Sequence, residues 1–399
     1  MDAADRTGDP NFPRGLRIQP SSLHRISKPI LPQGNGSDHG QLPPAAHNGA
    51  SNDTETASWE QDTAEDIEYY GIAGRIWEAA YLLARYLRPV NRLPGDLEFD
   101  PACSLFNPSG SAPLTIVELG SGAGYGSLHL ARQLVSHAEN SSPKPPQARL
   151  VLTDLENVVP LMERNVARAG FERATASIDV RVRSLAWGNE GHATSLLKEL
   201  SSTATSSRAT VNPLSHILCS DLVYFPELLP LLLRSIISLS GYGLTPADEG
   251  DSRTTSSKGP ELIISYKIRS LTKEQPFWSA LGSWFDLQAV DCRPILTENA
   301  AADDAEEEWH RFGSTGQDYG ASADSDQELF VFVGHRRRDT IGCVAPESDA
   351  DLMHGKRLRS CPGSEEKGGG ERGFRLESPS SGQDYFEWLL LSNMGAGFG

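Results

Sequence analysis

Apolar residues in the middle of the chain come in short runs that alternate with stretches of helical periodicity. Runs rich in Val, Ile and Leu predict strands that are buried on both faces, as in a parallel sheet. The predicted strands are Leu114–Leu119, Arg149–Thr153, Ile178–Arg183, His216–Cys219, Glu261–Tyr266, Phe285–Asp291 and Leu329–Gly334. The predicted helices between them are Ser127–Val135, Val158–Ala169, Pro226–Leu239 and Lys273–Leu281. This alternation predicts an α/β fold, with a parallel sheet covered by helices on both faces.

The two ends of the predicted sheet depart from this alternation. Only a hydrophilic stretch, without helical periodicity, separates Phe285–Asp291 from Leu329–Gly334. Parallel neighbours need a crossover connection, so we expect the last strand to pair antiparallel. Before the first strand, apolar residues at helical spacing run from Ile72 to Leu87, and Pro89 ends the predicted helix.

Composition divides the chain into one domain and two tails. Residues 1–58 are rich in Pro, Gly, Ser, Asn and Asp without periodicity, which predicts a disordered tail. We expect the folded domain to span residues 65–338 and residues 339–399 to be mostly disordered. A short apolar segment, Tyr385–Leu391, could dock on a partner or on the domain itself. The predicted surface insertions of low complexity are Ser141–Gln147, Glu199–Val211, Gly241–Gly259 and Asn299–Asp326.

Charge and cysteine content narrow the class of protein. The chain has 36 basic and 53 acidic residues, which give a formal net charge of −17. This charge disfavours nucleic acid as a binding partner and suits a basic protein or a small molecule. The five Cys lie far apart without zinc-binding spacing, so we expect reduced thiols and no metal site. Neither a leader peptide nor an apolar run of about 20 residues is visible, so we expect no membrane span. We expect a monomer in the cytoplasm, with the nucleus as an alternative.

A glycine-rich turn after the first predicted strand carries the first candidate chemistry. The run Thr115–Gly124 is a strand that ends near Glu118 and continues into Gly120 and Gly122. A dinucleotide fingerprint requires Gly-x-Gly-x-x-Gly, and Tyr125 occupies its last position. An acid and an open backbone suit the ammonium end of an amino acid. The turn therefore favours S-adenosylmethionine over NAD, although glycine turns also occur as plain connections.

Acids follow two more of the predicted strands. Asp154, at the tip of the second strand, could accept both ribose hydroxyls or could cap the following helix. Trp187 could pack its ring against an adenine, although a Trp at such a position is more often a core residue. Asp221 ends a buried strand and Tyr224 follows it, at the sheet edge where open α/β sheets bind substrates. The alternative for Asp221 is a loop cap.

Taken together, these segments resemble the seven-β-strand S-adenosylmethionine-dependent methyltransferases. More narrowly, they resemble methyltransferase family 16, whose members methylate lysines of non-histone proteins such as chaperones and translation factors. The segments that carry the resemblance are Ile76–Ala80, Glu118–Gly124, Asp154 with Leu155, Leu185–Gly188, Asp221–Tyr224 and Tyr266–Arg269, followed by Phe277 and Trp278. It covers residues 65–338 and implies a Rossmann-like sheet of seven strands, the last antiparallel.

The resemblance also implies a cofactor and its contacts. The cofactor is S-adenosyl-L-methionine, and with Glu118 the expected contacts are Trp77, Gly120, Ser121, Gly122, Asp154, Trp187 and Ser220. Ser220 stands where the family often has Ala.

The implied activity is methylation of a lysine side chain of a protein substrate. A free lysine has a pKa of about 10.4 and must lose a proton before it attacks. We expect Asp221 to orient the amine and stabilise the positive charge that forms, and Tyr224 to line the access channel.

The acidic stretch Asp303–Glu308 could attract a basic substrate. A small-molecule N-methyltransferase, acting on a nicotinamide-like amine, and a catalytically silent scaffold remain alternatives. A nucleobase methyltransferase is disfavoured, because such enzymes carry prolines where this chain has Leu222 and Val223.

Overall fold

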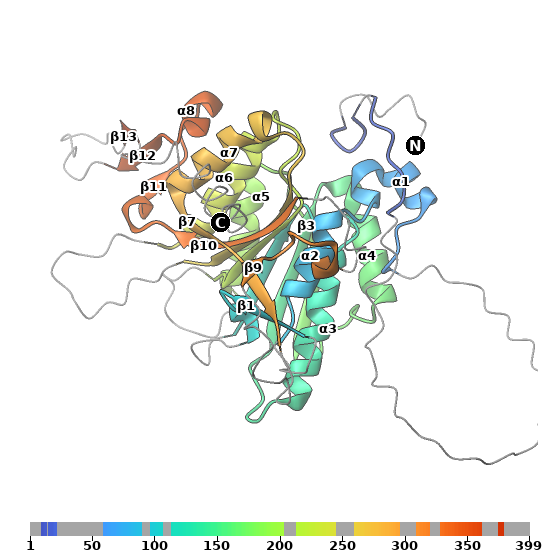
Figure 1. Cartoon of the computed structure of the whole chain (residues 1–399). Helices are drawn as coiled ribbons and strands as arrows, with labels where there is room; N and C mark the ends of the chain where they lie inside the picture. The colour runs from blue at the N-terminus through green and yellow to red at the C-terminus, as the bar shows by residue number, and fades with distance from the viewer. Residues whose placement is uncertain are drawn as a thin grey trace, which may run out of the picture.

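A seven-stranded sheet forms the centre of the protein (Figure 1). The computed structural model describes residues 9–13, 15–21, 59–89, 96–106, 113–202, 213–244, 259–295, 309–319, 328–360 and 374–378. The sheet has the order β4-β3-β2-β5-β6-β10-β7. The strands are β2 (Thr115–Leu119), β3 (Ala148–Asp154), β4 (Ile178–Ser184), β5 (His216–Ser220), β6 (Glu261–Lys267), β7 (Phe285–Ala289) and β10 (Leu329–Arg336).

The directions of these strands confirm the predicted fold class. Strands β4, β3, β2, β5 and β6 pair in parallel, and β10 pairs antiparallel with both β6 and β7. The last strand thus enters between two strands of the opposite direction, so the connection from β7 needs no helix. The sheet is the seven-stranded, mostly parallel one that the sequence predicts.

Helices cover both faces of the sheet because alternate strand residues point to opposite sides. Ile116, Leu150 and Leu218 pack in one apolar core with α2 (Glu78–Tyr86), α3 (Tyr125–Asn140) and α4 (Val159–Arg168). Their neighbours Val117, Val151 and Ile217 pack in a second core. That core includes α5 (Glu190–Ser202), α6 (Leu229–Gly241) and α7 (Leu271–Trp284).

Helix α5 is absent from the predicted elements, because its end overlaps Glu199–Val211, whose Ser- and Thr-rich composition predicts a surface insertion. Ala193, Leu196, Leu197 and Leu200 are nevertheless spaced three and four residues apart and are buried in the second core. This spacing is a helical signal that the composition of the following residues obscured.

Smaller elements surround the sheet. A three-stranded antiparallel sheet joins β1 (Leu97–Asp100), β8 (Asp291–Pro294) and β9 (His310–Arg311). A helix, α1 (Ala64–Tyr70), and a 3₁₀ turn, η2 (Gly71–Gly74), precede α2. Other 3₁₀ turns are η3 (Ser104–Phe106), η4 (Glu156–Val158), η5 (Gly316–Tyr319) and η6 (Arg338–Thr340).

The tail expected from residue 339 onward is partly folded, so that prediction is wrong for residues 339–360. They form β11 (Cys343–Val344), α8 (Asp349–Met353) and β12 (Arg357–Ser360), and β12 pairs with β13 (Phe374–Glu377). Cys343 and Leu352 are buried in the second core, and Arg336 donates to the Cys343 carbonyl at 2.8 Å. Two apolar side chains and one buried arginine therefore extend the domain beyond the last sheet strand.

The N-terminal prediction also needs correction. Residues 9–13 and 15–21, within the stretch expected to be disordered, are part of the structure, and Asn11 and Ser21 are buried. The segments Asp303–Glu308 and Tyr385–Leu391 lie outside the described residues. Among the helices that the structure describes, none is long and apolar enough to cross a membrane.

Candidate cofactor and substrate site

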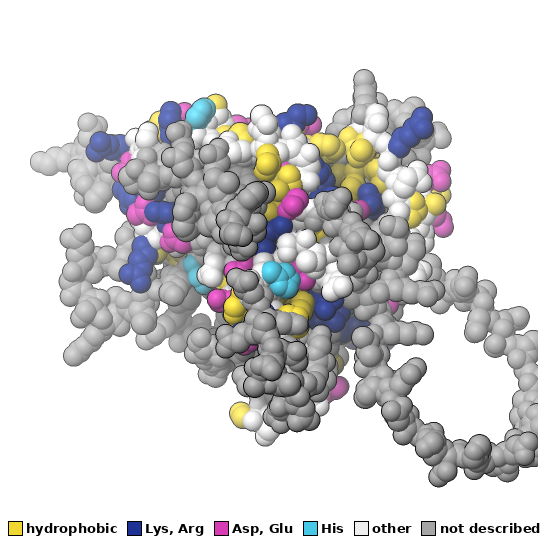
Figure 2. Space-filling view, in the orientation of Figure 1, with side chains coloured by type: hydrophobic (Ala, Val, Ile, Leu, Met, Phe, Trp, Pro, Cys, Tyr) yellow, Lys and Arg dark blue, Asp and Glu magenta, His cyan; other side chains and the backbone are white. Residues whose placement is uncertain are grey.

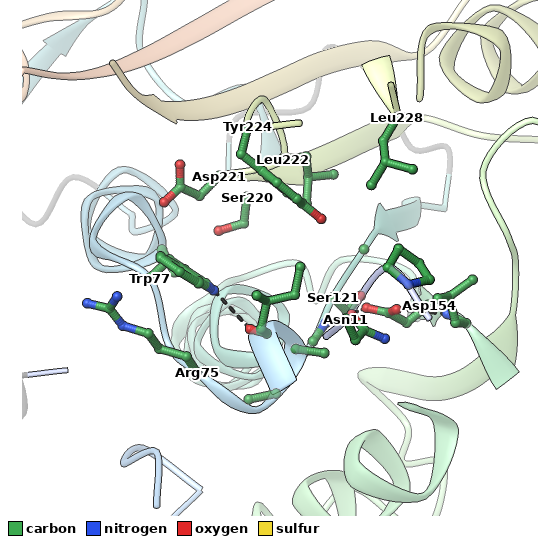
Figure 3. Close-up of a pocket in the computed structure, with 18 of the residues that line it drawn as sticks. Asn11, Arg75, Trp77, Ser121, Asp154, Ser220, Asp221, Leu222, Tyr224 and Leu228 are labelled. Carbon is green, nitrogen blue, oxygen red and sulfur yellow. Dashed lines mark hydrogen bonds between the residues drawn. The ribbon is translucent and has the colours of Figure 1, made fainter. Parts of the chain in front are cut away.

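A cavity of about 400 Å³ lies at the carboxyl ends of β2, β3 and β5 (Figure 3). All of the site residues expected from the sequence line it: Trp77, Glu118, Gly120, Ser121, Gly122, Asp154, Trp187, Ser220, Asp221 and Tyr224. Its size falls in the range of small-molecule sites. The fold thus brings together residues from five separate stretches of the chain.

The glycine turn lets the backbone form one wall of this cavity. Gly120 has φ +56° and Gly122 has φ +52°, in the left-handed region that favours glycine. A Cβ on Gly122 would lie 2.9 Å from the carbonyl oxygen of Ala73, and one on Gly120 would lie 2.8 Å from the Trp187 ring. Any side chain at these positions would therefore collide with the opposite wall or fill the cavity.

Among the residues that line the cavity, Glu118 is an acid without a paired counter-charge. It is 1% exposed, and its Oε2 atom has no hydrogen-bond partner among the described residues. Burial raises the pKa of this carboxyl to about 7. A buried carboxyl group in this state is suited to receive a positively charged ligand group.

Asp154 ends β3 with both oxygens turned toward backbone amides. Its Oδ2 accepts from the amide of Gly122 at 2.8 Å, and its Oδ1 accepts from the amide of Leu155 at 2.7 Å. Burial nevertheless raises its pKa to about 6. The residue that caps α4 is Val158, so Asp154 does not serve as the helix cap that was its alternative role. Each oxygen keeps a lone pair that can accept from a ligand hydroxyl.

Aromatic side chains form the other walls. The indole nitrogen of Trp77 donates to the carbonyl of Ile72 at 2.9 Å, and the guanidinium of Arg75 lies 4.3 Å from the Trp77 ring centroid. The rings of Trp187 and Tyr224 are tilted against each other with centroids 6.4 Å apart. Burial raises the pKa of the Tyr224 phenol above its usual range, so it stays a neutral hydrogen-bond donor.

Asp221 does not present a free carboxylate to the cavity. Its Oδ1 and Oδ2 accept from the two terminal nitrogens of Arg269 at 2.8 and 2.7 Å. Burial alone would lower the pKa of Arg269, but the adjacent Asp221 carboxylate raises it above its usual range. Asp221 has φ +59°, the only positive φ of a residue other than glycine in the described part of the chain. Backbone strain and a bidentate ion pair thus fix this carboxylate at the end of β5.

Sequence reasoning did not assign Arg269 to the site, although it lines the cavity. Its position along the chain could have indicated this role. Arg269 follows β6 by two residues, and Ser265 of β6 pairs with Ser220 at the end of β5. Carboxyl ends of neighbouring parallel strands meet at one edge. Other cavity residues outside the prediction include Pro10, Asn11, Leu16, Arg75, Leu222, Phe225, Leu228 and Leu231.

A second polar cluster, far along the chain, joins Cys292, His310 and Asp318. His310 Nε2 lies 3.3 Å from the Cys292 sulfur and 3.2 Å from Asp318 Oδ1, and the other Asp318 oxygen accepts from the Gly313 amide at 2.9 Å. Cysteine spacing gave no sign of this group. Hydrogen bonding accounts for its contacts, and Asp318 holds the turn that follows β9.

Comparison with known proteins relates part of this chain to a known family. Residues 57–245 match the family model of methyltransferase family 16, described as lysine methyltransferase. The expected resemblance to this methyltransferase family is thereby confirmed over these residues, which make up slightly less than half of the chain. No curated protein matches the chain.

Two solved structures are similar at low identity. One is the mitomycin 7-O-methyltransferase MmcR, with 8% identity and a TM-score of 0.30, covering 67% of this chain and 55% of that one. The other is an O-methyltransferase family 2 protein from Planctomyces limnophilus in complex with apigenin, with 12% identity and a TM-score of 0.29. That match covers 68% of this chain and 65% of the other. The chain therefore spans less than two thirds of the length of either protein.

Proposed function

We propose that the protein transfers a methyl group from S-adenosylmethionine to the amine of a lysine side chain in a non-histone protein. The observation that carries this proposal is one cavity with an acid at each end, Asp154 and Asp221 (Figure 3). The first acid suits the nucleoside end of the cofactor and the second suits an amine. The family match supports the same reaction.

The residues present fit the cofactor. Asp154 has lone pairs for the ribose hydroxyls, and Trp187 offers a flat apolar wall for adenine. The unpaired Oε2 of Glu118 suits the ammonium of the amino-acid end, directly or through a water. When bound, the cofactor supplies the electrophilic methyl group and a thioether leaving group.

The Asp221–Arg269 pair would prepare the attacking amine. Each Asp221 oxygen keeps a lone pair beyond its bond to Arg269, so it can accept an N–H of a neutral amine and direct the nitrogen lone pair toward the methyl group. The guanidinium charge disfavours an ammonium beside it, which promotes loss of the lysine proton to solvent before attack. Trp77 and Tyr224 would enclose the alkyl stem of the lysine.

A protein substrate agrees with the surface beyond the cavity. Tyr224 and Phe225 are partly exposed, and Pro226 and Glu227 after them are exposed, so the substrate end reaches the surface. The net charge of −17 favours a basic partner. On the face shown in Figure 2, the described Lys and Arg side chains are interspersed with Asp and Glu, without a continuous basic stripe. A nucleic-acid substrate is therefore not favoured.

Labelled S-adenosylmethionine in a hypomethylated cell extract tests the proposal. The extract receives wild-type protein, Asp221→Asn or the control Glu227→Gln, which removes an exposed carboxylate from the next turn. A labelled protein band whose label lies on lysine, seen with wild type and the control but not with Asp221→Asn, would support the proposal. Label only in small molecules would replace it with a small-molecule methyltransferase. A wild-type protein that fails to bind the cofactor in calorimetry would point to a silent scaffold.

A further inference from the structure

A short piece of the N-terminal region lies against the cofactor cavity. We call residues 9–13 and 15–21 the N-terminal segment; Pro10, Asn11 and Leu16 of this segment line the cavity. In Figure 1 it is the dark blue chain beside α1. Residues 22–58, between this segment and the domain, are outside the described part of the chain.

Hydrogen bonds attach the N-terminal segment to the domain at three points. Asn157 of η4 donates to the Asp9 carboxylate at 2.7 Å, and the amide of Ile72 donates to the Asn11 carbonyl at 3.0 Å. At the other end, the amide of Ser21 donates to both oxygens of Asp62, at 2.9 and 3.2 Å. Attachments at residues 9, 11 and 21 hold both ends of the segment against the domain.

The domain also leaves room for this segment. Gly71 has φ +59°, and a Cβ at this position would lie 1.9 Å from the carbonyl oxygen of Asn11. No other residue type could stand there with the N-terminal segment in place. Glycine therefore allows the main chain of Asn11 to reach the amide of Ile72.

Asn11 has a polar group that none of the described residues satisfies. The residue is 5% exposed, and its Nδ2 atom has no hydrogen-bond partner among the described residues. Figure 3 places Asn11 beside Asp154, on the same side of the cavity. A buried amide donor without a partner is costly, which indicates a site for a ligand acceptor.

The chemistry of a ribose fits this pair of side chains. Each ribose hydroxyl can donate one hydrogen bond and accept others, whereas the Asp154 carboxylate can only accept. The Asn11 amide is the donor that Asp154 cannot provide. We infer that Asn11 is a cofactor-binding residue that donates to a ribose oxygen, and that the N-terminal segment closes the nucleoside end of the cavity. The inference rests on the proposed cofactor site.

Calorimetry of the full-length protein with S-adenosylhomocysteine tests the inference. Asn11→Ala should weaken binding roughly tenfold, the effect of one lost buried hydrogen bond. Asn11→Asp should weaken binding further, because it places a second carboxylate next to Asp154. Gln19→Ala, an exposed amide of the same segment, serves as the control and should bind like wild type.

The outcomes separate this inference from the proposed function. If wild type does not bind S-adenosylhomocysteine, both fail. If wild type binds and Asn11→Ala binds equally well, only the role of Asn11 is overturned. A second measurement, hydrogen exchange, should show slower exchange of residues 9–21 when S-adenosylhomocysteine is bound. Unchanged exchange there would overturn the closing of the cavity by the N-terminal segment.

Discussion

Arg269 holds both carboxylate oxygens of Asp221, at 2.8 and 2.7 Å, across the ends of two neighbouring strands. The Asp221 side chain is fully buried, and the Arg269 side chain is 26% exposed. The pair is neutral overall, so it can sit beside a neutral amine without attracting the ammonium form. It also sets the direction in which the remaining lone pairs of Asp221 point.

Asp221→Asn should reduce methyl transfer at least about 100-fold, because it removes the charged acceptor that orients the amine. Asn tolerates the positive φ of this position, so the backbone turn should persist. Affinity for S-adenosylhomocysteine should stay within about threefold, since Asn has nearly the size of Asp and the change lies at the substrate end of the cavity. Single-turnover transfer and calorimetry measure the two quantities. A variant with full transfer would remove Asp221 from the mechanism.

Arg269→Lys should lower transfer about tenfold, because one ammonium cannot hold both Asp221 oxygens in a fixed plane. The effect should largely disappear in the Asp221→Asn background, since both changes break the same pair. Arg337→Lys is the control, because Arg337 pairs with Asp286 and Asp339 at the surface and outside the cavity. If the losses of methyl transfer in Arg269→Lys and Asp221→Asn simply add in the double variant, the two residues do not act as a pair.

Glu118→Gln should change how the stability of the ligand-free protein depends on pH. Burial raises the pKa of Glu118 from 4.5 in the unfolded chain to about 7 in the folded one. The carboxyl group therefore contributes fully to stability below pH 4.5, and this contribution is lost as the pH rises through about 7. Relative to wild type, the Gln variant should gain up to about 3 kcal/mol over this interval. Urea unfolding at pH 5 and pH 8 measures the gain, and an equal difference at both pH values would refute the shift.

Gly122→Ala should impair cofactor binding, whereas Gly170→Ala should not. Both glycines have positive φ, +52° and +83°, so either substitution should cost about 1 kcal/mol of stability through the backbone alone. Only at Gly122 does the new Cβ meet a wall of the cavity, 2.9 Å from Ala73 O; at Gly170 nothing lies within 4 Å. We expect roughly tenfold weaker binding of S-adenosylhomocysteine by the first variant alone. Equal affinities in calorimetry would rule out a close approach at the turn.

The central sheet and most of the site could be predicted because their signals are local. Each strand is a run of apolar residues, and residues that follow parallel strands share one edge, so Glu118, Asp154 and Asp221 could be assigned together. Helix α5 was missed where Ser and Thr residues weakened an apolar spacing that was nevertheless present. The folded part after residue 338 was missed because its apolar residues, around Cys343 and Leu352, form two short groups without sustained periodicity in a stretch rich in charge.

By itself, the sequence determined the order of the strands and helices, the glycine turn and the family whose model residues 57–245 match. Only the tertiary structure decided that Arg269 holds Asp221 and that Asn11 reaches the side of Asp154. The physical reason is that periodicity and turn chemistry act between residues a few positions apart. Partners far apart in sequence have no local pattern, and they meet only when the sheet edge and the glycine at position 71 create the space between them.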